Sequence, residues 1–196
     1  MVTKTRKTKE TDISVSLNLY GSGESKIDTG VGFLDHMLES FAKHSLIDLD
    51  VKCTGDTHID DHHSVEDVGI VIGSLLSEVL YPAKGIERFS NSSVVMDEAC
   101  VECDLDLSNR PFLVYDLDVY GKVGNFDTEL VEEYFRAFIL NASISAHIIQ
   151  KRGKNKHHII EAAFKAVAVS IRRAIEKNDR IGIPSTKDML WLSWLY

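Results

Sequence analysis

The hydrophobic pattern of the first half of the chain changes between the alternation of strands and the spacing of helices. Apolar residues alternate over 6–20, and a Gly-Ser-Gly turn follows. They then recur at three- and four-residue intervals before alternation returns, and a polar loop leads into a second helical stretch. The predicted elements are strands at 6–20, 24–28 and 47–53 and helices at 33–41 and about 61–80.

The second half repeats this order after a hinge at 81–85, where a proline and a glycine interrupt the pattern. Its predicted elements are strands at 93–96, 99–107, 112–119 and 145–151 and helices at 131–142 and 157–177. A repeated order of elements indicates a duplicated unit. The predicted fold class is therefore α+β, a two-layer α/β sandwich made of two duplicated half-domains, 1–87 and 88–196. Each is expected to have a mixed or antiparallel sheet and paired helices.

Composition is that of a folded globular protein, with 44% hydrophobic and 27% charged residues among 196. The net charge of −8 disfavours binding to nucleic acid. The longest apolar stretch, 68–76, is too short to span a membrane. The basic residues near the N-terminus precede no apolar run, so no secretory signal is predicted and a cytoplasmic protein is expected.

One metal-ligand pattern, His-His-x-x-Glu, occurs twice, at 62–66 and at 157–161. On a helix, His62 and Glu66 lie one above the other, while His63 points about 100° away. Adjacent histidines that diverge in this way suit two different metals. Imidazole with carboxylate favours manganese, iron, zinc or nickel over calcium.

A single copy of the pattern would also be explained as a solvated helix cap, with Asp60 or Asp61 as the N-cap. Two copies in matched positions favour the metal. The helix upstream of each motif extends the match, because His36 in the first half aligns with Glu133 in the second. Both residue types bind metals, so each half offers four potential ligands.

The three cysteines carry no comparable signal. Cys100 and Cys103 have C-x-x-C spacing, but no second pair completes a zinc ribbon. The alternation around them predicts a strand, on which residues three apart point to opposite faces. We therefore expect them to be structural.

The segments 32–37, 58–67 and 153–162 resemble signatures of the imidazoleglycerol-phosphate dehydratase family, and the resemblance runs from about residue 7 to 187. It implies loss of water from imidazole glycerol phosphate to give imidazole acetol phosphate, a step of histidine biosynthesis. It also implies two Mn²⁺ ions per active site, with ligands from both repeats and from neighbouring subunits. The implied assembly is a homo-oligomer in which trimers build a 24-subunit shell.

The resemblance assigns roles to individual residues. The metal ligands are His36, His62, His63, Glu66, Glu133, His157, His158 and Glu161. Glu133 departs from many family members, which have histidine there; its carboxylate would change the electron-withdrawing power of its metal. His147 is expected to be structural or to lie behind the ligands.

The remaining roles concern catalysis and substrate. Glu10, His62 and His158 are the expected catalytic residues, with Glu10 as acid or base. The phosphate, a dianion, requires charge-assisted hydrogen bonds. The expected substrate contacts are His44, Arg88, Arg110, Lys165, Ser185 and Lys187.

Two metals suit this reaction, because metals on both ring nitrogens would make the ring imidazolate-like and help it to expel a hydroxyl group. A metal-dependent hydrolase and a non-enzymatic metal-storage shell remain as alternatives. A hydrolase would not require Glu10 or the phosphate cations. A storage shell would take up metal without responding to imidazole phosphates.

Overall fold

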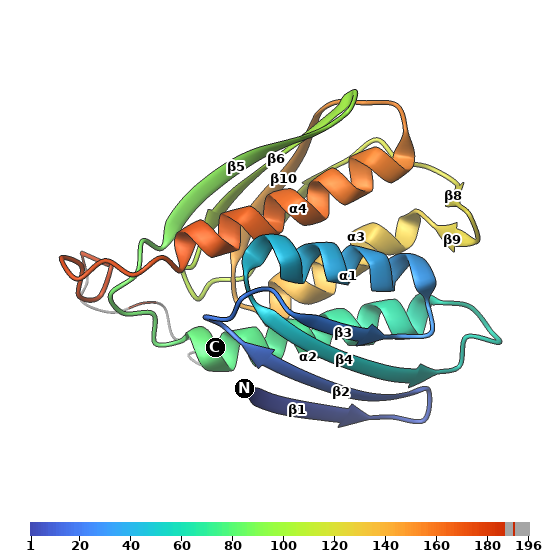
Figure 1. Cartoon of the computed structure of the whole chain (residues 1–196), viewed down its shortest axis with the longest axis horizontal. Coiled ribbons are helices and arrows are strands. Elements are labelled where there is room, and N and C mark those ends of the chain that lie inside the picture. Colours follow the sequence, from blue (N-terminus) through green and yellow to red (C-terminus); the bar gives the residue numbers. More distant parts are fainter. Residues whose placement is uncertain (187–189, 191–196) are drawn as a thin grey trace.

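The computed structural model describes residues 1–186 and 190. Two four-stranded sheets lie on opposite sides of the molecule, with the helices between them (Figure 1). The first sheet has the order β1-β2-β4-β3 and the second β5-β6-β10-β7. The first half contains β1 (Val2–Lys7), β2 (Thr11–Asn18), β3 (Ser25–Asp28), α1 (Gly32–Ser45), β4 (Asp48–Gly55) and α2 (His62–Leu80).

The second half has the same sequence of elements with one insertion. It contains β5 (Phe89–Met96), β6 (Ala99–Asp106), β7 (Phe112–Asp116), α3 (Glu129–Asn141), β10 (Ser145–Arg152) and α4 (Lys156–Ala174). The insertion is a short hairpin of β8 (Lys122–Val123) and β9 (Phe126–Asp127). In each sheet the last pair, β3 with β4 or β7 with β10, is parallel and the other pairs are antiparallel.

The α+β fold class is confirmed, and the periodicity that predicted it is visible in the burial of the strands. In β2, Ile13, Val15 and Leu17 are buried and alternate with more exposed residues. The same alternation runs through β6, where Cys103 is buried and Cys100 lies on the opposite face. Burial raises the pKa of Cys103 to about 12, and all three cysteines are free thiols.

The prediction of one strand over 6–20 was wrong, because the chain turns back after β1. The Thr8 hydroxyl accepts hydrogen bonds from the backbone N–H groups of Glu10 and Thr11, and this turn separates β1 from β2. The strand β1 has no apolar alternation, since its inward side chains are Lys4 and Arg6. Both form ion pairs with acidic side chains of α2.

Helices of the two halves pack directly on one another, α1 against α4 and α2 against α3. Two glycines on one side of α2 permit this approach. A Cβ at Gly69 would lie 3.0 Å from the carbonyl oxygen of Tyr134, and one at Gly73 would overlap that of Phe138. Phe41 of α1 meets Phe138 edge to face, with ring centroids 5.8 Å apart. The core is therefore continuous between the halves. Among the described helices none has the length and apolarity that a membrane crossing needs.

Substitution of Gly73 by alanine should force α2 and α3 apart. We expect a loss of roughly 1–3 kcal/mol in the free energy of unfolding, the usual cost of overpacking. Gly32→Ala is the matched control, because a Cβ there meets nothing within 4 Å, and its stability should be unchanged or slightly raised. Urea unfolding measures both. Equal stabilities for the two variants would contradict the close approach of these helices.

Candidate metal centre

Three potential metal ligands converge where α1 of the first half crosses α4 of the second. The Nε2 atoms of His36 and His157 lie 3.4 and 3.1 Å from Oε2 of Glu161. Two ligands at right angles, each about 2.1 Å from a metal, lie about 3.0 Å apart, so these spacings fit a shared ion. The donor set of two imidazoles and one carboxylate is suited to manganese, iron or zinc.

The surroundings of Glu161 keep it ionised and in position. It is only 7% exposed. Burial opposes ionisation, but Lys165, His36 and His157 together hold the pKa of this carboxyl below its ordinary value. The Lys165 ammonium lies 2.7 Å from Oε1, which leaves Oε2 facing the histidines. Phe33 packs edge to face on the His157 ring, with centroids 5.3 Å apart.

The first motif does not form an equivalent group. In α2, Nε2 of His62 lies 3.7 Å from Oε2 of Glu66. Within the described part of the chain, His36, His157 and Glu161 are the only set of three such side chains with ligand atoms within 4.8 Å of one another. Glu133, half-buried on α3, does not come that close to His62 and Glu66.

The second histidine of each motif points away from the three-residue cluster and lies between two carboxylates. Nδ1 of His63 is 3.1 Å from both carboxylate oxygens of Asp56, and its Nε2 is 3.8 Å from Oε1 of Glu10. The pKa of His63 is raised, and its hydrogen bond with Asp56 is the largest cause. The rings of His62 and His63 are nearly perpendicular, at 86°, so one helix start presents ligands in two directions.

The second half repeats this arrangement with other residues. Nδ1 of His158 is 2.8 Å from Oε2 of Glu98, and its Nε2 is 3.8 Å from Oδ2 of Asp97. Glu98 also accepts hydrogen bonds from the backbone N–H groups of Lys154 and Asn155. The hydrogen bond with His158 is the largest of the causes that lower the pKa of Glu98 to about 2, and the two backbone hydrogen bonds add to it. Glu98 in turn raises the pKa of His158. Carboxylates commonly orient metal-binding histidines through the nitrogen that does not bind.

Two residues predicted to bind the substrate phosphate, Arg88 and Arg110, both lie near Asp106, which the sequence did not single out. Asp106 accepts from Nε and Nη2 of Arg88, at 2.7 and 3.2 Å, and lies 3.9 Å from Nη2 of Arg110. Nη1 of Arg88 donates to the carbonyl oxygen of Pro184, which precedes Ser185. Arg88 also has a left-handed backbone, with φ of 69°. Arg88, Arg110 and the segment with Ser185 are thus gathered in one region.

The other predicted substrate contacts are at different places. Lys187 lies outside the described residues. Lys165 borders the metal cluster through Glu161. His44 lies near the end of α1. Burial is the largest cause that lowers its pKa, and the nearby charges of Lys165 and Arg172 lower it further.

The helix α4 separates the two groups of predicted site residues. His157 is its second residue, whereas the backbone N–H of Arg88 donates to the carbonyl oxygen of its last residue, Ala174, at 2.9 Å. At 1.5 Å per residue, about 26 Å of helix lie between them. The metal cluster and the arginines therefore lie at opposite ends of α4.

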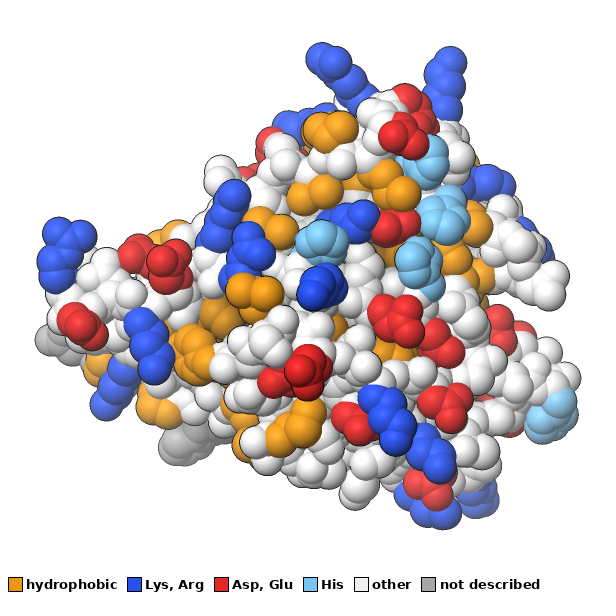
Figure 2. All heavy atoms as spheres, viewed as in Figure 1, with side chains coloured by type: hydrophobic (Ala, Val, Ile, Leu, Met, Phe, Trp, Pro, Cys, Tyr) orange, Lys and Arg blue, Asp and Glu red, His pale blue; other side chains and the backbone are white. Residues whose placement is uncertain are grey.

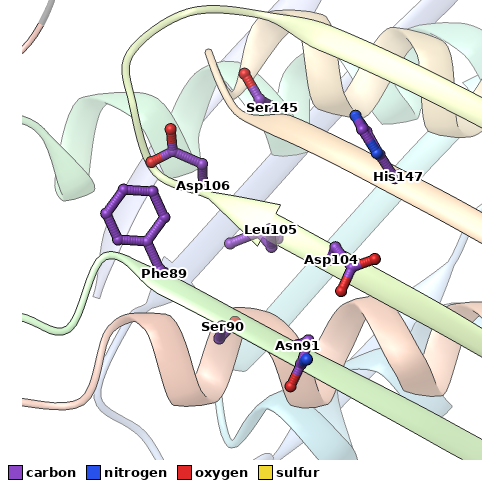
Figure 3. Close-up of a pocket in the computed structure, with 8 residues that line it drawn as sticks. All are labelled: Phe89, Ser90, Asn91, Asp104, Leu105, Asp106, Ser145 and His147. Atoms are coloured by element: carbon purple, nitrogen blue, oxygen red, sulfur yellow. The ribbon is translucent and has the colours of Figure 1, made fainter.

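Potential metal ligands are also visible at the surface. Figure 2 shows histidines gathered on one face beside acidic and basic side chains. His147 belongs elsewhere: it lies on the outer face of the second sheet, in a hollow of about 510 Å³ (Figure 3). Asp104 on the neighbouring strand pairs with it in register. The position of His147 separates it from the cluster, which lies on the helices.

Sequence reasoning did not identify Asp56, Glu98 or Asp106 as parts of the site. The signal for Glu98 was available in the repeat, since it ends the β5–β6 turn as Glu10 ends the β1–β2 turn. Asp56 and Asp106 had no comparable signal. Asp56 follows the end of β4, and Asp106 ends β6 beside Phe89, so each meets its partner through the folding of the sheets.

The fold and these residues define a class: a duplicated α+β protein with a cluster of potential metal ligands between its halves. A family model described as imidazoleglycerol-phosphate dehydratase matches residues 29–171. The chain is 73% identical over 190 residues to such a protein of Sulfurimonas denitrificans, covering 97% of this chain and 100% of the other. It is 68% identical over 186 residues to one of Wolinella succinogenes, covering 95% and 98%.

Solved structures agree with the sequence relatives. Imidazoleglycerol-phosphate dehydratase from Staphylococcus aureus is 41% identical, with a TM-score of 0.80 over 91% of this chain and 100% of the other. The Pyrococcus furiosus structure is 36% identical, with a TM-score of 0.83 over 95% and 100%. The chain belongs to the imidazoleglycerol-phosphate dehydratase family.

Loss of any member of the cluster should weaken metal binding. For His36→Ala we expect Mn²⁺ affinity at that site to fall by at least roughly 100-fold, the upper range for loss of a residue behind a ligand. Isothermal titration with Mn²⁺ measures this. His147→Ala is the control and should bind as the unaltered protein does. An unchanged affinity in His36→Ala would rule out the cluster as a metal site.

Glu98→Gln should lower the pKa of His158, because it removes the carboxylate whose hydrogen bond is the largest cause of the raised value and whose charge adds to it. In metal-free protein the His158 ring would then lose its proton at a lower pH than before. A pH titration of the histidine ring resonances by NMR follows this change. Asp56→Asn should do the same to His63 alone, and a His158 midpoint that does not move in Glu98→Gln would contradict the assigned contact.

Proposed function

We propose that this chain catalyses the manganese-dependent elimination of water from imidazole glycerol phosphate, giving imidazole acetol phosphate in histidine biosynthesis. The observation that carries this proposal is the convergence of His36, His157 and Glu161 in a chain of the dehydratase family. Those residues fit a divalent metal in donor type and spacing. The reaction class is a carbon–oxygen lyase.

The proposed cofactor is a pair of Mn²⁺ ions per active site, which would supply Lewis acidity to the imidazole ring of the substrate. His36, His157 and Glu161 would hold one ion. His62 and Glu66 would hold the other, with Glu133 in the position that corresponds to His36. The outward-facing His63 and His158 would complete the ligand sets from neighbouring copies.

Glu10 is the proposed acid or base for proton transfer at the substrate. Its side chain is 53% exposed and lies 3.8 Å from Nε2 of His63, so it borders a proposed ligand and remains accessible. A carboxylate can serve in this role when it is held within hydrogen-bond reach of the reacting carbon. His62 and His158 would act by binding the ions that polarise the ring.

The phosphate would be recognised by Arg88, Arg110, Ser185 and Lys187. The bidentate contact of Asp106 fixes the Arg88 guanidinium, and the contact with Pro184 ties the segment that carries Ser185 to it. A fixed guanidinium loses little side-chain entropy when it binds an anion. His44 and Lys165 would contact the substrate nearer the metals.

The length of α4 supports an active site shared between copies of the chain. Three carbons separate the ring of the substrate from its phosphate ester, a span below about 10 Å at roughly 1.5 Å per bond. The metal cluster and Arg88 are separated by about 26 Å along α4. One substrate molecule would therefore take its metals from one copy and its phosphate cations from another, in agreement with the proposed trimers and 24-subunit shell.

Turnover of imidazole glycerol phosphate by the Mn²⁺-loaded protein, followed as ketone product, tests the function. Product should form, cease on chelation and return when Mn²⁺ is restored. Glu10→Gln should lower kcat by roughly 100- to 10,000-fold, the range for an acid or base, with Mn²⁺ affinity unchanged. Metal-replete, folded protein without product would overturn the proposal. Hydrolysis of phosphate esters or simple metal uptake would then be measured.

A further inference from the structure

The turns β1–β2 and β5–β6 hold equivalent positions in the two halves, but their glutamates are used differently. Glu98 in the second turn is engaged by several groups, since it accepts from the backbone N–H groups of Lys154 and Asn155, just before α4, and contacts His158. Glu10 in the first turn is half exposed, and its one ion-pair contact in the described structure is His63, at 3.8 Å. The second hairpin is therefore anchored by its own glutamate, whereas the first is not.

A buried carboxylate of α2 anchors the first hairpin instead. Asp67 is 7% exposed, and its Oδ2 lies 2.5 Å from Nη1 of Arg6 and 2.5 Å from the donating hydroxyl of Thr11. Arg6 precedes the turn and Thr11 follows it. Both ends of the turn that carries Glu10 are thus fastened to one carboxylate.

The connection from this anchor to Glu10 is short. Thr8 and Thr11 lie within hydrogen-bond distance through their hydroxyls, at 3.3 Å, and the Thr8 hydroxyl accepts from the backbone N–H of Glu10 at 3.1 Å. Asp67 lies one helical turn after His63, so both face the same side of α2. The anchor and the His63 ring against which Glu10 lies are therefore built on one face.

The corresponding position in the second half lacks a carboxylate. Asp67 follows the glutamate of the first His-His-x-x-Glu motif, and the residue that follows the glutamate of the second motif is Ala162, which is fully buried. In the described part of the chain, an anchor from the helix is found in the half whose turn glutamate has a half-exposed side chain that accepts no backbone hydrogen bond. The two features together distinguish the halves.

We propose that Asp67 is a positioning residue: by binding Arg6 and Thr11 it fixes the β1–β2 turn on α2 and leaves Glu10 free to transfer protons. This role rests on the proposed function, in which Glu10 is the acid or base. Displacement of a reacting group by about 1 Å can cost on the order of 100-fold in rate. Asp67 acts only through Glu10 and does not touch the substrate.

The test is a double-mutant cycle on the Mn²⁺-loaded assembly, with Asp67→Asn made alone and together with Glu10→Gln. Asp67→Asn should lower kcat by roughly 10- to 100-fold, with KM and Mn²⁺ affinity within about twofold of the unaltered protein. In the Glu10→Gln background it should cause no further loss. Glu78→Gln is the matched control, because it breaks the other ion pair between β1 and α2, with Lys4, and should leave kcat unchanged.

Each result decides a separate point. A Glu10→Gln variant with full activity would refute the acid or base role itself. If that role holds, an equal loss from Asp67→Asn in both backgrounds, or no loss in either, would overturn the positioning role. Should Asp67→Asn fail to fold, Thr11→Val removes one of the two contacts and keeps the ion pair with Arg6. A loss confined to kcat would then support the inference, and an unchanged kcat would overturn it.

Discussion

The packing of helices from opposite halves is the constraint on which the site depends. His36 belongs to α1 of the first half, and His157 and Glu161 belong to α4 of the second, so neither half contains the cluster by itself. The crossing is held by the core that the halves share, including the contact of Phe41 with Phe138. A change in the helix crossing would therefore alter the spacing of His36 from Glu161.

Duplication provided two sets of equivalent positions, and the two sets have diverged in their chemistry. The turn glutamate of the second half orients His158, whereas that of the first half, Glu10, remains half exposed. The second half has a buried alanine where the first has Asp67. Similar folds with dissimilar polar contacts allow one half to hold ligands rigidly and the other to keep a carboxylate available.

Much of the fold could be predicted because the buried residues recur with the period of the secondary structure, every second residue in β2 and every third or fourth in the helices. The strand β1 could not, since its inward side chains are Lys4 and Arg6, whose charges are compensated by α2. The His-His-x-x-Glu motifs pointed to potential metal ligands but not to how they are grouped: only His36, His157 and Glu161 come together among the described residues. The contact of Glu98 with His158 joins residues 60 apart in the sequence, and only the folded chain brings them together.

The partial charges at the two ends of α4 match the charged side chains that lie there. The start of a helix carries partial positive charge, which stabilises carboxylates, and its end carries partial negative charge, which stabilises cations. Glu98 accepts from the backbone N–H groups of Lys154 and Asn155, just before the start of α4, and Arg172 and Arg173 lie in its last turn. The backbone N–H of Arg88 donates to the carbonyl oxygen of Ala174 at that end. The carboxylate beside His158 and the arginines are therefore each stabilised at their own end of α4. In the proposed function this separation divides the site into two parts, and a substrate much shorter than α4 would take its metal ligands and its phosphate cations from two copies of the chain.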